Sequence, residues 1–299
     1  MTFKEFTEVV VEEISEKINY KGLVEIHNIK KNNDVELHGL SIYANNRNIS
    51  PTIYLEPFYE LYKKDVPLDL LIDKIWSIYE ENIPKVNVDM MFFMNFDQIK
   101  DKIFYRLVHA ERNKELLTDV PHILIWDLAI CFCYACSLEG VGDGMILIHN
   151  AQMENWNVNT QTLMQLAEVN TPRLFPMCFQ GMQEILKQMD FEFDLYECEE
   201  EQLYVLSNTT RTYGASVILY PETLAYVAEK LQCDFYILPS SVHEVIVLKK
   251  ERYDILQNEG KRMHEMIKSI NQEQLSAEEV LTDYPFYYDC FEAKLCQLI

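Results

Sequence analysis

The sequence predicts an α+β protein with mixed, mainly antiparallel sheets, built from β-hairpins and covered by flanking helices. Residues 203–250 alternate apolar runs and turn-forming residues in the order strand, turn, strand, helix, strand, turn, strand,. Along the whole chain, predicted hairpins outnumber strand–helix–strand crossovers, and a hairpin places its two strands antiparallel. Apolar residues make up 48% of the 299 residues and aromatic residues 12%, which is enough to fill one large core or two modest ones,.

The first part of the chain begins with a predicted helix. Thr2 and Glu5 form a capping box, and apolar residues recur behind it at helical spacing to about Lys17,. The next predicted elements are a hairpin at 23–30 and 35–43, a strand at 52–55, a helix that Pro57 opens and a helix from residue 70 to about Pro84,.

The middle of the chain mixes short helices and strands. Asn159 caps a predicted helix that ends at Thr171-Pro172, because the residue before a proline is biased away from helical backbone angles,. The other elements predicted here are a helix at 87–102, a strand at 103–109, a short helix at 111–117, a hairpin at 125–136 and 145–150, and a helix at 177–189,.

The last part follows the pattern of residues 203–250. Residues 208–211 form the turn of its first hairpin, Tyr220-Pro221-Glu222 opens its helix, and residues 239–244 form its second turn,. A helix at 253–271, a helix capped by Ser276 and Glu279, and an aromatic tail at 284–288 complete the chain,. We expect an N-terminal α+β region at 1–190 and a C-terminal ββαββ-plus-helices region at 191–299, or a single domain.

Charge and cysteine content limit the partners and the compartment. The chain has 26 basic and 48 acidic residues, a formal net charge of −22, which repels phosphates and anionic membrane surfaces,. We therefore expect no nucleic-acid partner and no membrane partner. The first 18 residues carry scattered acids and no apolar leader, and no apolar run is long enough for a bilayer span,. Eight cysteines without an export signal indicate free thiols in the cytoplasm,.

Known catalytic and cofactor motifs are missing from the sequence. Only 8 glycines occur, and neither a P-loop, a G-x-G-x-x-G turn, an H-E-x-x-H helix nor a G-x-S-x-G elbow is present,. Cys131, Cys133 and Cys136 lie in an apolar run, and no second cysteine pair completes a zinc site,. We predict that these three thiols pack in a core, and we predict no cofactor and no metal.

Two turns in residues 203–250 hold the candidate ligand-binding residues. Ser240, Ser241 and His243 lie in the second turn, and Asn208 and Arg211 lie in the first. If the two hairpins share a sheet, these turns form one polar rim, and Arg211 is suited to bind an anion. The proline-flanked Arg173 is a further candidate for the rim, or else a structural ion-pair partner. Ordinary exposed turns remain the alternative for both segments.

Five blocks of the sequence carry a resemblance to a known family. They are LVHAERNKELLTDVPHI, MILIHNAQMENW, NTPRLFPMCFQGM, YVLSNTTRTYGAS and FYILPSSVHEVIVL. Together they resemble an uncharacterised family, catalogued only as a domain of unknown function and typical of clostridia and related Gram-positive bacteria, over roughly residues 50–290. The resemblance implies a bacterial cytosolic protein, and it implies no activity and no catalytic residue.

Three classes of function stay open at this point. The first is a non-enzymatic module that binds an unknown protein or small ligand, since no complete catalytic set is present. The second is a hydrolase that uses Ser240 or Ser241 with His243 and an acid from elsewhere, because Glu244 and His243 point to opposite faces of an extended strand. The third is an acidic anti-defence or DNA-mimic protein, which rests on the net charge alone.

Overall fold

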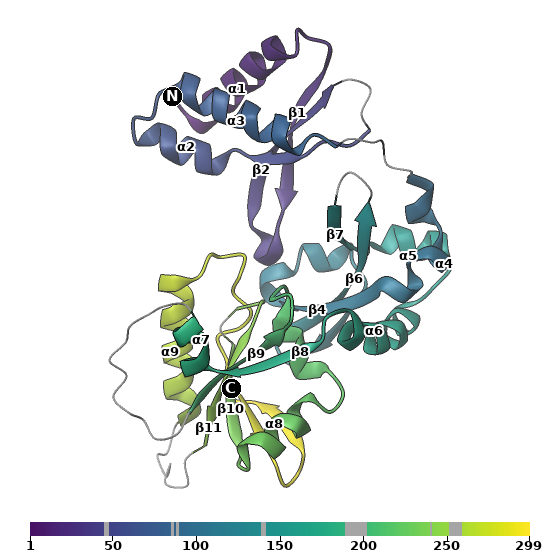
Figure 1. Cartoon of the computed structure of the whole chain (residues 1–299), viewed down its shortest axis with the longest axis vertical. Coiled ribbons are helices and arrows are strands. Elements are labelled where there is room, and N and C mark those ends of the chain that lie inside the picture. Colours follow the sequence, from purple (N-terminus) through teal and green to yellow (C-terminus); the bar gives the residue numbers. More distant parts are fainter. Residues whose placement is uncertain are drawn as a thin grey trace. The chain divides into compact units, whose positions relative to one another are not determined.

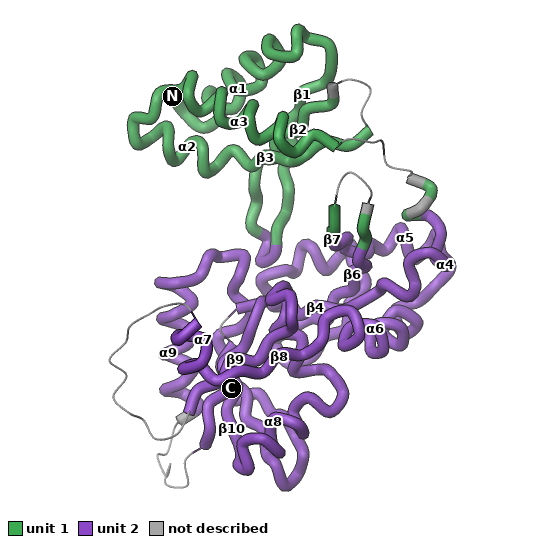
Figure 2. Tube along the Cα trace, viewed as in Figure 1, with its two compact units in different colours: residues 1–31, 35–93, 136–144 green, residues 32–34, 94–135, 145–299 purple. Residues whose placement is uncertain are grey.

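The computed structural model describes residues 1–44, 48–84, 87, 90–138, 142–188, 202–239, 241–250 and 259–299. The chain forms two compact units, coloured separately in Figure 2: residues 1–31, 35–93 and 136–144, and residues 32–34, 94–135 and 145–299. The residue ranges of these two units do not coincide with the predicted regions 1–190 and 191–299. The predicted boundary falls among residues 189–201, which lie outside the described part of the chain.

The first unit packs three helices on a small antiparallel sheet of strand order β1-β2-β3. Its α1 starts at the predicted capping box, in which Thr2 N donates to the Glu5 carboxylate at 2.7 Å and Thr2 Oγ1 accepts from Glu5 N at 3.3 Å,. The elements are α1 (Phe3–Lys17), β1 (Gly22–Lys30), β2 (Glu36–Ala44), β3 (Thr52–Tyr54), α2 (Glu56–Lys63) and α3 (Leu68–Asn82). They match the helices and the hairpin that the sequence predicts.

Two sheets organise the rest of the chain (Figure 1). A four-stranded sheet has the order β4-β6-β5 with β7 on β6, and a six-stranded sheet has the order β13-β12-β10-β11-β9-β8. The strands are β4 (Ile103–His109), β5 (His122–Ile125), β6 (Leu128–Leu138), β7 (Gly142–Leu147), β8 (Met177–Gly181), β9 (Leu203–Asn208), β10 (Phe235–Pro239), β11 (Val245–Lys249), β12 (Phe286–Asp289) and β13 (Lys294–Gln297). Every described register is antiparallel, which confirms the predicted α+β class.

Helices and short 3₁₀ segments lie around these two sheets (Figure 1). The helices are α4 (Phe96–Ile99), α5 (Asn150–Trp156), α6 (Thr160–Leu174), α7 (Met182–Gln188), α8 (Thr223–Leu231) and α9 (Glu259–Gln274). The 3₁₀ segments are η1 (Asn32–Asp34), η2 (Met90–Met94), η3 (Lys100–Lys102), η4 (Glu111–Asn113), η5 (Leu116–Thr118) and η6 (Gly214–Leu219). The helix predicted at 87–102 was wrong, because its described residues form the separate short segments η2, α4 and η3.

Two predicted helices are present as α6 and α7, but the predicted end of the first and the predicted start of the second were wrong. Helix α6 continues through Pro172 to Leu174, because a proline in the last turn removes only one helical hydrogen bond, and Phe175 N still donates to Thr171 O at 2.9 Å,. The segment predicted as a helix at 177–189 begins as strand β8, which pairs with β9 in the register Gly181 to Tyr204. A short apolar run does not by itself distinguish the two structures.

In three places the last part of the chain has a structure that differs from the predicted one or adds to it. The strand expected after the turn at 208–211 is the 3₁₀ segment η6, whose residues from Gly214 to Ile218 are all buried. Ser276 and Glu279 form a hydrogen-bonded turn in place of a capped helix. The aromatic tail is strand β12, which pairs with both β10 and β13 and buries Phe286 completely. The C-terminal aromatics therefore belong to the main sheet.

Candidate functional site

The two predicted turns meet at one end of the six-stranded sheet. Strands β9 and β11 pair directly, with Leu206 opposite Val245, so the loop after β9 and the turn before β11 lie side by side. Ser207 Oγ donates to the carbonyl of His243 at 2.7 Å, and Ala215 N donates to the carbonyl of Val242 at 3.2 Å. These bonds tie the two segments into one structure.

Asn208 organises the loop that follows β9. Its Nδ2 donates to the carbonyl of Thr212 at 2.9 Å, and its Oδ1 accepts from Thr210 Oγ1 at 3.0 Å and from Thr212 N at 3.3 Å. Only 2% of Asn208 is exposed. A buried asparagine that bonds its own backbone in this way stabilises a turn, so Asn208 shapes the loop.

Ser241 and His243 form the facing turn, and Ser240 lies outside the described residues. Ser241 Oγ accepts from His243 N at 3.0 Å, and Ser241 N donates to the carbonyl of Glu244 at 3.1 Å. The imidazole Nδ1 of His243 accepts from Tyr213 N at 3.3 Å. Because Nδ1 is the acceptor, the proton of the neutral ring resides on Nε2, which makes Nε2 a hydrogen-bond donor.

The side chain of Tyr213 joins this turn to the four-stranded sheet. Its ring centre lies 5.7 Å from that of His243, with the rings inclined by 31°. The guanidinium carbon of Arg106, on β4, lies 4.6 Å from the centre of the same Tyr213 ring,. We call the following set the polar cluster: Arg106, Ser207, Asn208, Tyr213, Ser216, Ser241 and His243.

Burial sets the polar cluster apart from ordinary exposed turns. Ser216 Oγ donates to the carbonyl of Tyr213 at 2.8 Å, which fixes the backbone of Tyr213 at its positive φ of 50°. Tyr213 and His243 are half-buried. The other members are 9% exposed or less: Arg106, Ser207, Asn208, Ser216 and Ser241. Polar side chains are seldom so enclosed, and here most of their groups bond one another.

Sequence analysis did not single out four members of the cluster, Ser207, Tyr213, Ser216 and Arg106, and Arg106 is the one that carries a charge. It lies within the apolar strand at 103–109, where it pairs in register with Cys131. A single cation in the middle of an otherwise apolar strand was the signal that would have found it, because a charged residue is seldom buried without a partner or a role.

The other two predicted arginines are held by different partners. Arg173 donates to the carbonyl of Asp101 and to Asn170 Oδ1, the latter at 3.1 Å, which ties α6 to η3. Arg211 is exposed and donates to Gln180 Oε1 on β8 at 3.3 Å. Arg211 therefore lies at the solvent edge of the loop, whereas the described bonds of Arg173 are structural.

The three neighbouring cysteines pack in the interior, as predicted. Cys131, Cys133 and Cys136 are all buried, and burial raises the pKa of Cys131 to about 12,. Across the described residues, no group of three or more histidine, cysteine, aspartate or glutamate side chains is arranged to hold a metal ion.

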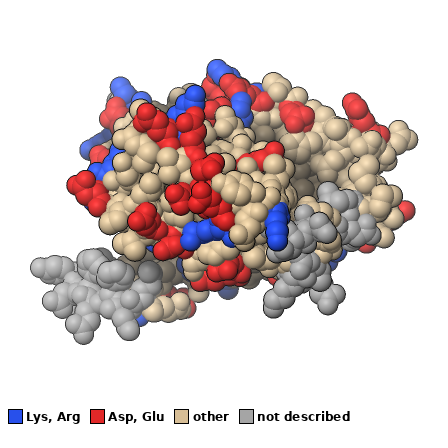
Figure 3. Space-filling model, turned by 90° about the horizontal axis from the view of Figure 1, so that it is seen from above, with Lys and Arg blue, Asp and Glu red and all other residues tan. Residues whose placement is uncertain are grey.

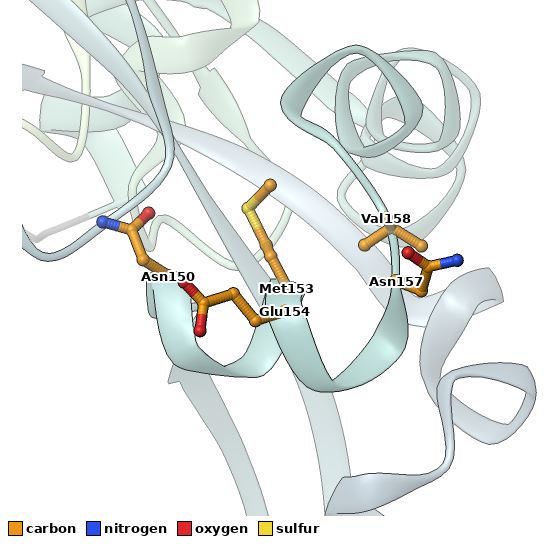
Figure 4. A pocket seen from close by; sticks show the side chains of 5 residues that line it. All are labelled: Asn150, Met153, Glu154, Asn157 and Val158. Atoms are coloured by element: carbon orange, nitrogen blue, oxygen red, sulfur yellow. The ribbon is translucent and has the colours of Figure 1, made fainter.

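Described residues of the second unit line at least two surface hollows. Figure 4 shows one of about 380 Å³ on α5, lined by Asn150, Met153, Glu154, Asn157 and Val158. It offers a carboxylate and two amides from one short helix and the residues that follow it. The other, of about 330 Å³, is lined by Pro172, Pro176, Met177, Tyr220, Pro221, Glu222, Thr223 and Tyr226. Tyr220 also lies close to Asn208 and Ser216, so this second hollow borders the polar cluster.

Fold and cluster together define an α+β protein with a candidate binding face at one end of an antiparallel sheet. The chain belongs to a family of unknown function, DUF5688, whose model matches residues 3–290. Comparison with curated proteins and with solved structures gave no match. None of the helices in the described ranges combines the length and the apolar composition that a bilayer span requires.

Proposed function

We propose that this protein is a non-enzymatic module that binds a small ligand on the face formed by the loop at 208–213 and the turn at 241–244. One observation carries the proposal: the two turns are hydrogen-bonded into a single, largely buried polar cluster. Exposed connecting turns do not need such enclosure, whereas a binding site needs polar groups held in place before the ligand arrives. Tyr213 and His243, both half-buried, form the part of the cluster that a ligand reaches first.

The bonding of His243 favours binding over hydrolysis. A serine hydrolase needs an imidazole nitrogen that accepts the serine proton. Here Nδ1 already accepts from Tyr213 N, and Nε2 carries the ring proton. Ser241 Oγ meanwhile accepts from the backbone N–H of His243. In this arrangement His243 acts as a donor toward a ligand oxygen.

The charge distribution favours a small ligand over a DNA-binding partner protein. On the face shown in Figure 3, acidic side chains are interspersed with basic and uncharged ones. A DNA mimic needs a surface on which carboxylates dominate, as phosphates do along DNA. The net charge of −22 supports a protein without nucleic-acid or membrane partners,. The free thiols of the seven described cysteines support a cytoplasmic protein, and the family resemblance supports a bacterial one,.

A ligand screen with matched histidine variants tests the proposal. Thermal-shift measurements against neutral and anionic polar metabolites identify a binder, and calorimetric titration gives its Kd. We expect His243→Phe to weaken binding about tenfold, because phenylalanine keeps a ring but has no N–H to donate to the ligand. The control His264→Phe should bind as the wild type does, because His264 stacks on Tyr284 and bonds the carbonyl of Asp283, outside the proposed face. A screen without a binder, or equal binding by both variants, would contradict the proposal.

A further inference from the structure

We propose that Arg106 recognises the negatively charged group of that ligand, so that the ligand is a small molecule bearing a carboxylate or phosphate. This inference rests on the proposed binding function and adds the chemical class of the ligand to it. Arg106 lies on β4 beneath the ring of Tyr213 and is 9% exposed. The argument begins with the partners of its guanidinium group.

The positive charge of Arg106 has no carboxylate partner in the described part of the chain. No aspartate or glutamate described there forms an ion pair with it, and its Nε is enclosed without a hydrogen-bond acceptor. By contrast, Arg112 pairs with the Asp283 carboxylate at 2.8 Å, although it is more exposed. Among the described residues, one of the most enclosed cations is thus left without a carboxylate. Burying such a cation is costly unless an anion completes the site.

The two thiols beside Arg106 are uncharged near pH 7, whereas its guanidinium is charged. Burial opposes that charge, but the pKa of Arg106 is raised overall, so the guanidinium stays protonated. Burial also raises the pKa of both thiols, that of Cys131 to about 12, so neither is a thiolate near pH 7. The Tyr213 side chain attracts the cation through the face of its ring and also bonds the guanidinium through its hydroxyl, while the enclosed Nε has no acceptor,.

The geometry of these donors selects an oxyanion. A guanidinium presents its N–H groups as a planar fork that matches two oxygens of a carboxylate or phosphate. His243 contacts the same Tyr213 ring and contributes the Nε2 hydrogen as a second donor. An anion bound at the guanidinium would neutralise this buried charge. Arg106 is therefore the recognition group, and Tyr213 is the residue that positions it.

The experiment titrates the full chain with inorganic phosphate and with acetate at constant ionic strength. Calorimetry and thermal shift are recorded for the wild type, Arg106→Lys, Arg106→Met and the control Arg262→Met, which changes an exposed arginine on α9. We expect one anion to bind the wild type and the control equally. Arg106→Lys should bind about tenfold more weakly, because an ammonium group lacks the fork, and Arg106→Met should lose binding. Preference for phosphate indicates a phosphate ester as the natural ligand, and preference for acetate indicates a carboxylic acid.

The stability without added anion gives a second and independent readout. Arg106→Met removes a buried charge that lacks a counter-ion, so its unfolding midpoint should lie above that of the anion-free wild type. A lower midpoint, together with a wild type that no anion stabilises, would show that Arg106 is structural and would overturn the inference. If Arg106→Met does not fold, Arg106→Lys retains the charge, and unchanged anion binding by that variant overturns the inference as well.

The screen separates the two proposals. A neutral ligand that binds through His243, with no anion binding through Arg106, removes the anion inference and leaves the binding function intact. An anion that binds through Arg106 supports both. The absence of any binder removes both.

Discussion

At the scale of single residues, the polar cluster depends on the missing side chain of Gly214. A Cβ placed there would collide with Ser207 Oγ and the carbonyl oxygen of His243, and would lie 2.8 Å from Asn208 N. Two of these three atoms belong to the backbone and cannot turn aside as a flexible side chain can. Gly214 therefore allows the loop and the turn to approach within hydrogen-bonding distance.

We expect Gly214→Ala to lower the free energy of unfolding by about 1–3 kcal/mol, because an added methyl group must displace a packed backbone. Urea denaturation measures the change. Gly144→Ala is the control, since its Cβ would meet Cys136 Sγ at 3.4 Å, an ordinary contact distance. Equal losses in the two variants would contradict the close approach at Gly214.

The candidate site was predicted from the sequence in part. Asn208, Ser241 and His243 were recognised because asparagine, serine and histidine gather at turns for reasons that are local to the chain. Arg106 was not recognised, because only the antiparallel pairing of β4 with β6, together with the return of the loop at 208–213, brings it beneath Tyr213. For Arg173 the sequence left a structural role open, and its described bonds to Asp101 and Asn170 are of that kind.

At the scale of elements, the outer edge of β4 is closed by a side chain of α6. Thr171 Oγ1 accepts from Tyr105 N at 3.2 Å and donates to the carbonyl of Ala167 at 2.6 Å. An edge strand exposes unpaired backbone groups, and here a threonine on the packed helix satisfies one of them. Thr171 is only 1% exposed, so water does not replace this bond.

We expect Thr171→Val to cost about 1–3 kcal/mol of stability, because the change keeps the shape of the side chain and leaves the buried Tyr105 N–H without an acceptor. Thr7→Val is the matched control. The hydroxyl of Thr7 donates to the carbonyl of Lys4 at 2.8 Å within α1. That carbonyl also accepts the regular helical bond, so no backbone group loses its partner and we expect a cost of only about 0.5 kcal/mol. Thermal denaturation of both variants measures the two losses of stability. Equal losses would show that the bond at the edge of β4 adds nothing beyond that of an ordinary threonine hydroxyl.

Sequence patterns predict best the helices in which apolar residues recur at regular spacing over many residues and a capping residue marks the start. The helix from Phe3 to Lys17 has both, and it starts and ends as predicted,. Strand β8 and segment η6 are short apolar runs without a regular spacing of polar residues. The structure of β8 depends on its pairing with β9, and that of η6 on the bond to Val242. The aromatic tail likewise becomes a strand because it pairs with β10, a partner distant in the sequence.

At the scale of the whole molecule, each compact unit has buried residues of its own. The first unit encloses Ile14 completely, in a core shared by α1, α3 and the β1-β2-β3 sheet. The second encloses Ile237 completely, in the central strand β10. Chains with separate cores often unfold in more than one step.

We predict that differential scanning calorimetry resolves two unfolding transitions, and that Ile14→Ala and Ile237→Ala lower the midpoint temperatures of different ones. Each removes a buried side chain and should cost its own unit about 2–5 kcal/mol. The two variants serve as controls for each other, since both replace a fully buried isoleucine. A single transition that both variants shift equally would show that the two units unfold together.

The sequence by itself determined the α+β class, the helices with caps and the turns rich in asparagine and serine, because these depend on residues that lie close along the chain. Only the tertiary structure decided which turns meet, which short apolar runs become strands, and that Arg106 is enclosed without a carboxylate in the described part of the chain. The physical reason is that strand pairing and burial join residues far apart in sequence. Arg106 and Tyr213, more than a hundred positions apart, meet only in the folded chain.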